Sequence, residues 1–133
     1  MEITYSGACH CGAIRFKVQA EPHLNLLRCN CTICTKSGYL HLIVPQANFT
    51  LLQGTEKLVT YRFGSMVAQH TFCSICGVKA FYIPRSNPDG VDINAHYLEP
   101  VPTEITITHF DGQNWEDNAA TLSHLSQTDS NKS

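Results

Sequence analysis

The sequence predicts a single, mainly β domain, because short β-rich segments recur along a chain of only 133 residues. Each segment is rich in β-branched and aromatic residues and is bounded by glycine, proline or asparagine, as strands joined by turns usually are. Over residues 13–18 apolar and polar residues also alternate, which indicates a strand with one buried face.

The expected strands lie, in chain order, at residues 13–18, 41–44, 57–63, 79–83 and 104–110. Residues 83–90 are expected to form a loop, because two prolines there offer no backbone donor to a sheet. A short helix is expected to begin near Asn114, and the side chains that it directs inward are Trp115, Ala119 and Leu122. Residues 126–133 are small and polar, and we expect them to fray.

The charge and hydropathy of the chain argue against several classes of protein. The net charge is −2 and the chain has no run of Lys or Arg, which argues against binding nucleic acid through phosphate contacts. No apolar run approaches the roughly 18 residues that a membrane span needs, and residues 1–5 lack the features of a signal peptide. We therefore expect a cytoplasmic protein with reduced thiols and with no nucleic-acid or membrane partner.

The seven cysteines fall into three clusters, which are the most informative feature of the sequence for function. The clusters, in chain order, are Cys9 and Cys11, then Cys29, Cys31 and Cys34, then Cys73 and Cys76. An odd number of cysteines at such short spacings fits disulfides poorly, whereas grouped thiols are typical of metal sites. Seven thiols divide naturally into a closed four-thiolate site, typical of structural zinc, and an open three-thiolate site.

The closed site is expected to consist of the first and last clusters. On extended backbone the two cysteines of the first cluster would point to the same face. His10 between them would point away, so we expect it to orient the cluster and not to bind the ion. The last cluster is a tight C-x-x-C turn followed by Gly77, a residue that suits a positive φ.

The three central cysteines lie close enough in sequence to reach one ion together. The fourth ligand would then be a histidine, a carboxylate, water or substrate, and such an open position distinguishes catalytic from structural zinc. A rival grouping joins Cys73 and Cys76 to two of these three cysteines. Thiolates also bind iron, so spacing alone leaves the identity of the metal open.

Histidines near the clusters are candidates for moving protons. His70 lies three residues before Cys73, where it could support the site or donate a proton, the alternative being a histidine packed within a strand. His41 and His96 are further candidates, against a structural or surface role. The expected catalytic residues are Cys29, Cys31, Cys34 and His70. The histidines expected on the surface or in packing are His23, His109 and His124. Basic residues that could offset the thiolate charge are Arg15, Arg28, Lys36 and Lys79.

The three clusters, in this order, resemble those of the glutathione-dependent formaldehyde-activating family, which includes centromere protein V. The segments that carry the resemblance are GACHCGAIRF at residues 7–16, CNCTIC at 29–34, FCSICG at 72–77, FYIPRSNP at 81–88 and the region up to Trp115. The similarity covers residues 3–118, which we expect to form the zinc domain. Residues 119–133 would then be the end of a short helix and a flexible polar tail.

The resemblance implies a zinc-stabilised, tent-like β fold of packed antiparallel sheets. The residues that match the family's structural zinc ligands are Cys9, Cys11, Cys73 and Cys76. Those that match its second zinc site are Cys29, Cys31 and Cys34. The resemblance also implies the joining of glutathione to formaldehyde, an activity classed with the carbon–sulfur lyases.

We therefore expect a zinc-dependent enzyme of the carbon–sulfur lyase type that acts on a small, glutathione-like thiol or on its aldehyde adduct. The sequence has no diagnostic glutathione motif, and candidate contacts for the thiol are Arg85, Asn87 and Lys36. One alternative is a non-catalytic zinc-binding module for protein interaction, which should expose an apolar patch. Another is a redox or zinc-buffering thiol protein.

Overall fold

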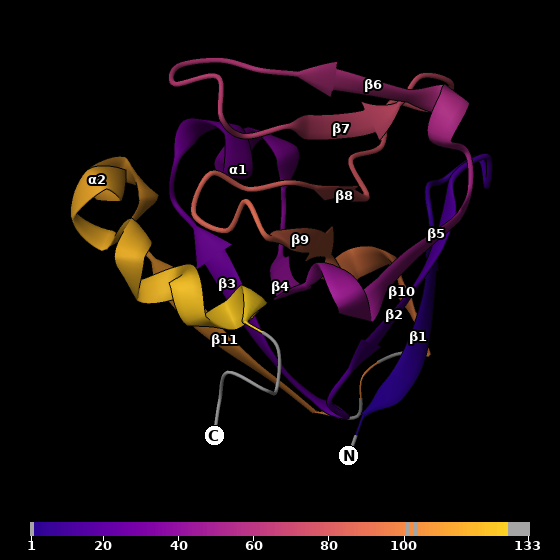
Figure 1. The fold of residues 1–133 in the computed structure, drawn as a ribbon, viewed down its shortest axis with the longest axis horizontal. Helices are drawn as coiled ribbons and strands as arrows, with labels where there is room; N and C mark the ends of the chain where they lie inside the picture. Colours follow the sequence, from indigo (N-terminus) through magenta and orange to yellow (C-terminus); the bar gives the residue numbers. More distant parts are fainter. Residues whose placement is uncertain (1, 101, 103, 128–133) are drawn as a thin grey trace.

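The computed structural model describes residues 2–100, 102 and 104–127. These residues form two larger sheets and a two-stranded hairpin around a common core (Figure 1). The predicted fold class is confirmed, because the chain is mainly β with packed antiparallel sheets in one domain.

The first sheet has the strand order β10-β1-β2-β5. Its strands are β1 (Ile3–Ala8), β2 (Arg15–Ala20), β5 (Phe49–Gln53) and β10 (Leu98–Glu99). The second sheet has the order β11-β3-β4-β9-β8. Its strands are β3 (His23–Cys29), β4 (His41–Pro45), β8 (Phe81–Tyr82), β9 (Gly90–Asn94) and β11 (Glu104–Phe110). The hairpin pairs β6 (Leu58–Tyr61) with β7 (His70–Cys73), and β11 and β3 form the parallel exception to the antiparallel pairing.

Helical segments are short and lie between or after the strands. The α-helices are α1 (Thr32–Ser37) and α2 (Trp115–Asn118). The 3-10 segments are η1 (Gln46–Asn48), η2 (Thr55–Lys57), η3 (Ala95–Tyr97), η4 (Gly112–Asn114) and η5 (Ala119–Ser126). The helix expected near Asn114 is confirmed, with Leu122 buried and Trp115 and Ala119 half-buried. Among the described residues, no helix has the length and apolar character needed to cross a membrane.

The expected strands are present with shifted ends. They correspond, in order, to β2, β4, β6, β8 and β11. The sequence does not predict β1, β3, β5, β7, β9 or β10. The expected boundary after residue 118 stays a prediction, and residues 128–133 of the expected tail lie outside the described residues.

Strand β2 connects the alternation in the sequence to the core. Alternate residues from Phe16 to Ala20 are buried, and those between them are exposed. The Phe16 ring packs against Phe49 and against Phe81 of the second sheet, with centroids 5.4 and 5.7 Å apart. Gly7 lies opposite Phe16 on β1, and a Cβ there would overlap the Phe16 ring. One aromatic cluster therefore joins the two sheets.

Every residue of β4 and β9 is buried, because both faces of the second sheet are covered. Residues opposite one another in a strand pair point to the same face. One face, with Leu42 opposite Ile93, packs on the core. The other face borders a cavity, and the register places on it Leu27, His41, Ile43, Tyr82 and Asp92. The loop between β6 and β7 and the segment η5 contribute further walls of this cavity.

Candidate metal centres

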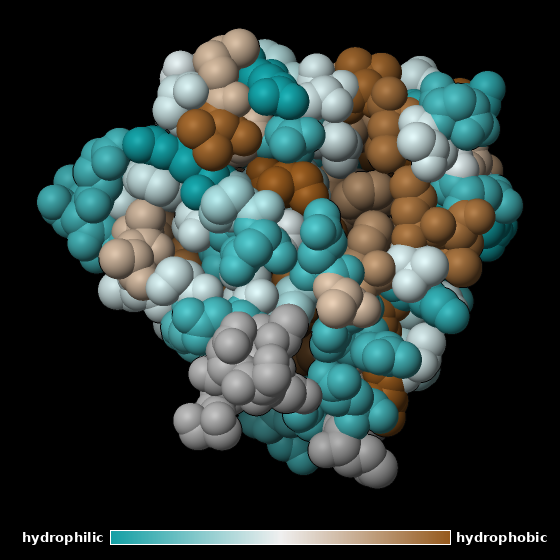
Figure 2. Space-filling view, in the orientation of Figure 1, coloured by the Kyte–Doolittle hydropathy of each residue, from teal (hydrophilic) through white to brown (hydrophobic). Residues whose placement is uncertain are grey.

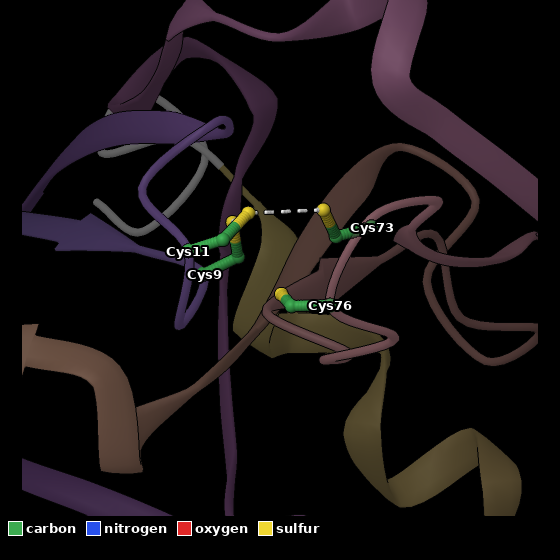
Figure 3. A group of neighbouring side chains, drawn as sticks. All are labelled: Cys9, Cys11, Cys73 and Cys76. Atoms are coloured by element: carbon green, nitrogen blue, oxygen red, sulfur yellow. Dashed lines mark hydrogen bonds between the residues drawn. The ribbon is translucent and has the colours of Figure 1, made fainter.

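The four cysteines expected at the closed site converge in the structure (Figure 3). All four sulfur atoms lie within 4.8 Å of one another. The Sγ–Sγ distance is 3.6 Å between Cys9 and Cys11 and 3.7 Å between Cys11 and Cys73. Four Zn–S bonds of about 2.3 Å in a tetrahedron place the sulfurs about 3.8 Å apart. The donor set, which Cys76 completes, therefore fits a zinc ion.

The two halves of this cluster come from turns. Cys9 and Cys11 lie just after β1 in a turn that Gly12 closes at a φ of +80°, so they meet through a turn and not on extended backbone. Gly77, after the second pair, has the expected positive φ of +74°. His10 is exposed and is not among the residues whose ligand atoms group together.

Backbone N–H groups point at the sulfurs and favour their thiolate form. The N–H of Ile14 donates to Cys9 Sγ, and the N–H of Ile75 donates to Cys73 Sγ, each at 3.4 Å. The N–H groups of Cys76 and Ile75 lower the pKa of the Cys73 thiol. A divalent cation would therefore meet, at Cys73, a sulfur that is already arranged to lose its proton.

The central three cysteines form a separate cluster, with their sulfurs also within 4.8 Å of one another. Cys29 ends β3, Cys31 precedes the first residue of α1, and Cys34 lies within α1. The grouping in the structure is thus four plus three, and the rival grouping with Cys73 and Cys76 does not form. Gly112 of η4 lies against this cluster, because a Cβ there would overlap Cys29 Sγ.

This second cluster is incomplete as a tetrahedral site. In the described part of the chain, no fourth His, Cys, Asp or Glu brings a ligand atom within the same reach of all three sulfurs. Hydrogen bonds from Cys29 and Cys34 hold the pKa of Cys31 down, at about 2. Hydrogen bonds with Cys29 and Cys31 raise the pKa of Cys34. The three thiols therefore share protons that a cation would displace.

His41 links the second cluster to a buried carboxylate. Its Nε2 lies 3.2 Å from Cys34 Sγ, and its Nδ1 lies 2.6 Å from Asp92 Oδ2. Both side chains are almost completely buried. When Cys34 is a thiolate, both ring nitrogens of His41 act as donors, one to sulfur and one to the carboxylate. Asp92 Oδ1 is the single buried side-chain oxygen or nitrogen without a partner among the described residues.

The register of the second sheet explains this arrangement. Asp92 lies opposite Ile43 on β4, so it shares a face with His41 two residues earlier. Sequence reasoning names His41 as a candidate but misses Asp92. The available signal is an acidic residue between Val91 and Ile93 in an otherwise apolar segment.

His70, the expected catalytic histidine, lies beside the cavity in an aromatic stack. Its ring stacks on Tyr82 and Phe63, with centroid distances of 4.7 and 5.2 Å. Lys79 Nζ lies 2.6 Å from His70 Nδ1 and 4.2 Å from the Tyr82 ring centroid. Burial, and then the charge of Lys79, lower the pKa of His70 to about 4. The ring is therefore neutral near pH 7, with Nδ1 accepting from Lys79 and the ring proton on Nε2.

All three central cysteines border a cavity of about 540 Å³. His41, His70 and Asp92 also border it. A second cavity of about 460 Å³ lies beside the same cluster but meets only two of its cysteines, Cys29 and Cys34. The larger cavity is therefore the one from which an open metal position would be reached.

The remaining predicted residues lie in varied positions. Arg85 borders the larger cavity, whereas Asn87 is fully buried and donates to the backbone oxygen of Leu122 at 2.9 Å. Lys36 is exposed and borders neither cavity. Besides His10, the exposed histidines are His23, His96, His109 and His124, of which His96 and His109 border the smaller cavity.

Comparison with known proteins adds a family and a shared fold. The family model described as glutathione-dependent formaldehyde-activating enzyme matches residues 4–110, which include all seven cysteines. A Halomonas elongata protein provisionally named a glutathione-dependent formaldehyde-activating enzyme is 32% identical over 78 residues. The alignment covers 53% of this chain and 50% of the relative, so the match spans about half of that protein's length.

A solved crystal structure is also similar. A Rhodobacter sphaeroides protein superposes with a TM-score of 0.66 at 32% sequence identity. The superposition covers 77% of this chain and 99% of that chain.

Proposed function

The chain belongs to the glutathione-dependent formaldehyde-activating family, and on this premise we propose that it is a zinc-dependent enzyme of the carbon–sulfur lyase type. Its substrate is proposed to be a small, glutathione-like thiol or the adduct of such a thiol with an aldehyde. The proposal includes two zinc ions, one structural at the four-cysteine cluster and one open at the three-cysteine cluster.

The observation that carries this proposal is the incomplete three-cysteine cluster beside the larger cavity. Three protein ligands and an accessible fourth position are typical of catalytic zinc, whereas four protein ligands are typical of structural zinc. Zinc bound there would supply a position that holds a substrate thiol as its thiolate and polarises a carbonyl oxygen.

The proposed reaction adds a thiol to an aldehyde, or reverses that addition. The sulfur bonds to the carbonyl carbon, the carbonyl π electrons move to oxygen, and the oxygen takes a proton. In the reverse direction the oxygen gives up that proton as the carbon–sulfur bond breaks. Each direction therefore needs a group that exchanges one proton with the substrate oxygen.

His70 and Lys79 are proposed to exchange that proton. The Nε2–H of His70 would pass to the substrate oxygen while Nδ1 takes a proton from the Lys79 ammonium, 2.6 Å away. Burial lowers the pKa of Lys79, which favours release of this proton. His41 and Asp92 are assigned a positioning role, because His41 hydrogen-bonds to Cys34 and does not itself join the group of ligand atoms.

Cys34→Ser is expected to abolish turnover and leave a folded protein, because it removes a ligand of the open site and no residue of the four-cysteine cluster. The assay is the loss of free thiol when glutathione and formaldehyde are mixed with the zinc-loaded protein, measured above the uncatalysed rate. Thr35→Ser, an exposed change on the same helix, is the matched control. A Cys34→Ser protein with the wild-type rate would refute the assignment.

A second candidate function is a non-catalytic zinc-binding module for protein interaction. The observation that favours it is a set of exposed apolar side chains on β5, β6 and the loop that follows: Leu52, Val59, Tyr61, Phe63, Met66 and Val67. Figure 2 shows apolar surface along the side of this face where β5 and β6 lie in Figure 1. Partner binding that survives Cys34→Ser, together with no turnover by the wild type, would favour this function.

We also propose a cytoplasmic location, because all seven cysteines are free thiols and such thiols persist in a reducing compartment. The proposed partner is a small molecule. Nucleic acid and membranes are not proposed as partners, because the net charge is −2 and the sequence has no basic run.

A further inference from the structure

The cavity beside the three-cysteine cluster is much larger than formaldehyde requires. Its volume is about 540 Å³, whereas a dry cavity of about 150 Å³ already holds benzene. Large apolar side chains make up much of its lining, among them Phe63, Tyr82, Phe110, Trp115, Leu27 and Ile43. Formaldehyde bears only hydrogen on its carbonyl carbon and would leave this surface without a ligand.

The charged arms of glutathione also fit this cavity poorly. Arg85 is the single Lys or Arg among the described residues that border it. The Arg85 guanidinium already lies 3.9 Å from the centre of the Trp115 ring and 2.6 Å from a carboxylate oxygen of Glu116. Because burying an unpaired carboxylate is costly, the two carboxylates of glutathione would remain outside the apolar part of the cavity.

The smaller cavity has the more polar lining of the two. Arg28, His96, His109 and Asp111 border that cavity, together with Cys29 and Cys34. The two sides of the cluster thus differ in chemistry. The apolar side is the one that all three cysteines border, so a group attached to the reacting carbon would extend into apolar surroundings.

We propose that the aldehyde half of the substrate carries an apolar substituent of aromatic size, so that the enzyme acts on thiol adducts of such aldehydes in preference to those of formaldehyde. This inference rests on the proposed function, because it concerns the substrate of that same site. The substituent would contact the aromatic lining, including Phe63, a partly exposed residue that borders the cavity. Such contacts are worth about tenfold or more in selectivity, since even one methylene group contributes that much.

The test compares phenylacetaldehyde with formaldehyde, using glutathione as the thiol and the zinc-loaded protein. We expect kcat/KM to be at least tenfold higher for phenylacetaldehyde. Phe63→Ala should reduce kcat/KM about tenfold more for phenylacetaldehyde than for formaldehyde, whose smaller loss reflects the stacking of Phe63 on His70, and Phe63→Leu should restore most of the difference. Ile107→Ala, an exposed apolar change outside both cavities, is the control and should have no effect.

Formaldehyde turned over as well as or better than phenylacetaldehyde would overturn the inference and leave the proposed function standing. An equal loss for both aldehydes in Phe63→Ala would also overturn it. A second readout is independent of turnover, because Trp115 is the only tryptophan of the chain and borders the cavity. Titration with unreactive 2-phenylethanol should change the Trp115 fluorescence until the site is saturated, and the affinity should be lower in Phe63→Ala. The absence of any fluorescence change would overturn the inference even if neither aldehyde reacts.

Discussion

Cys76→Ser is expected to unfold most of the protein at room temperature, because it opens the four-cysteine cluster. This cluster joins the turn after β1 to the turn after β7, and Cys11 and Cys73 within it are 62 positions apart. Binding of a structural zinc ion contributes about 10–16 kcal/mol to folding in small zinc domains, which equals or exceeds the total stability of about 5–15 kcal/mol for a typical domain. Circular dichroism during thermal unfolding, with the metal content measured in parallel, checks this expectation.

The matched control for this change is Ser74→Ala, in the same turn. Ser74 is exposed and is not one of the four candidate metal ligands. Its replacement should therefore leave both the unfolding temperature and the metal content close to those of the wild type. A Cys76→Ser protein that keeps the wild-type unfolding temperature would show that the cluster does not hold the fold together.

Asp92→Asn is expected to weaken metal binding at the three-cysteine cluster by about 10- to 100-fold, the usual effect of removing a group that orients a metal ligand. The carboxylate of Asp92 accepts the Nδ1 proton of His41 at 2.6 Å and keeps Nε2 a donor toward Cys34. A neutral amide would balance the charge of a protonated His41 poorly, and an unprotonated Nε2 would face the thiolate with its lone pair. Titration of the metal-free protein with Co²⁺, followed by its thiolate absorption, gives the affinity directly.

Asp117→Asn, an exposed change on α2, is the control for Asp92→Asn and should bind both metals as the wild type does. The four-cysteine cluster should also keep its metal in Asp92→Asn. Equal loss of both metals, or unfolding of the variant, would mean that Asp92 supports the fold as a whole and not the open site.

The three cysteine clusters were predictable because ligand spacing within a cluster is a local property of the chain. The tight turn after Cys73 and its positive-φ Gly77 follow directly from the C-x-x-C-G pattern. The alternation in β2 likewise identifies the buried Phe16 face. In both cases the residues that decide the structure lie within a few positions of one another.

The partners of the open site were not predictable in this way. Strands β4 and β9 are buried on both faces, so their sequences do not alternate and do not indicate which side chains face the cavity. The contact between His41 and Asp92 joins residues 51 positions apart and depends on the register of β4 with β9. Gly112 approaches Cys29 only because the chain turns into η4 after β11 pairs with β3.

We propose that the seven cysteines hold two zinc ions of unequal accessibility, and metal content per chain tests this most directly. We predict two zinc ions per chain in freshly prepared protein. A mild chelator should remove one of them while the circular dichroism spectrum is retained, and Cys34→Ser should contain only the ion that resists the chelator. A single, tightly held ion in the wild-type protein, or two ions that leave together as the fold is lost, would contradict the account.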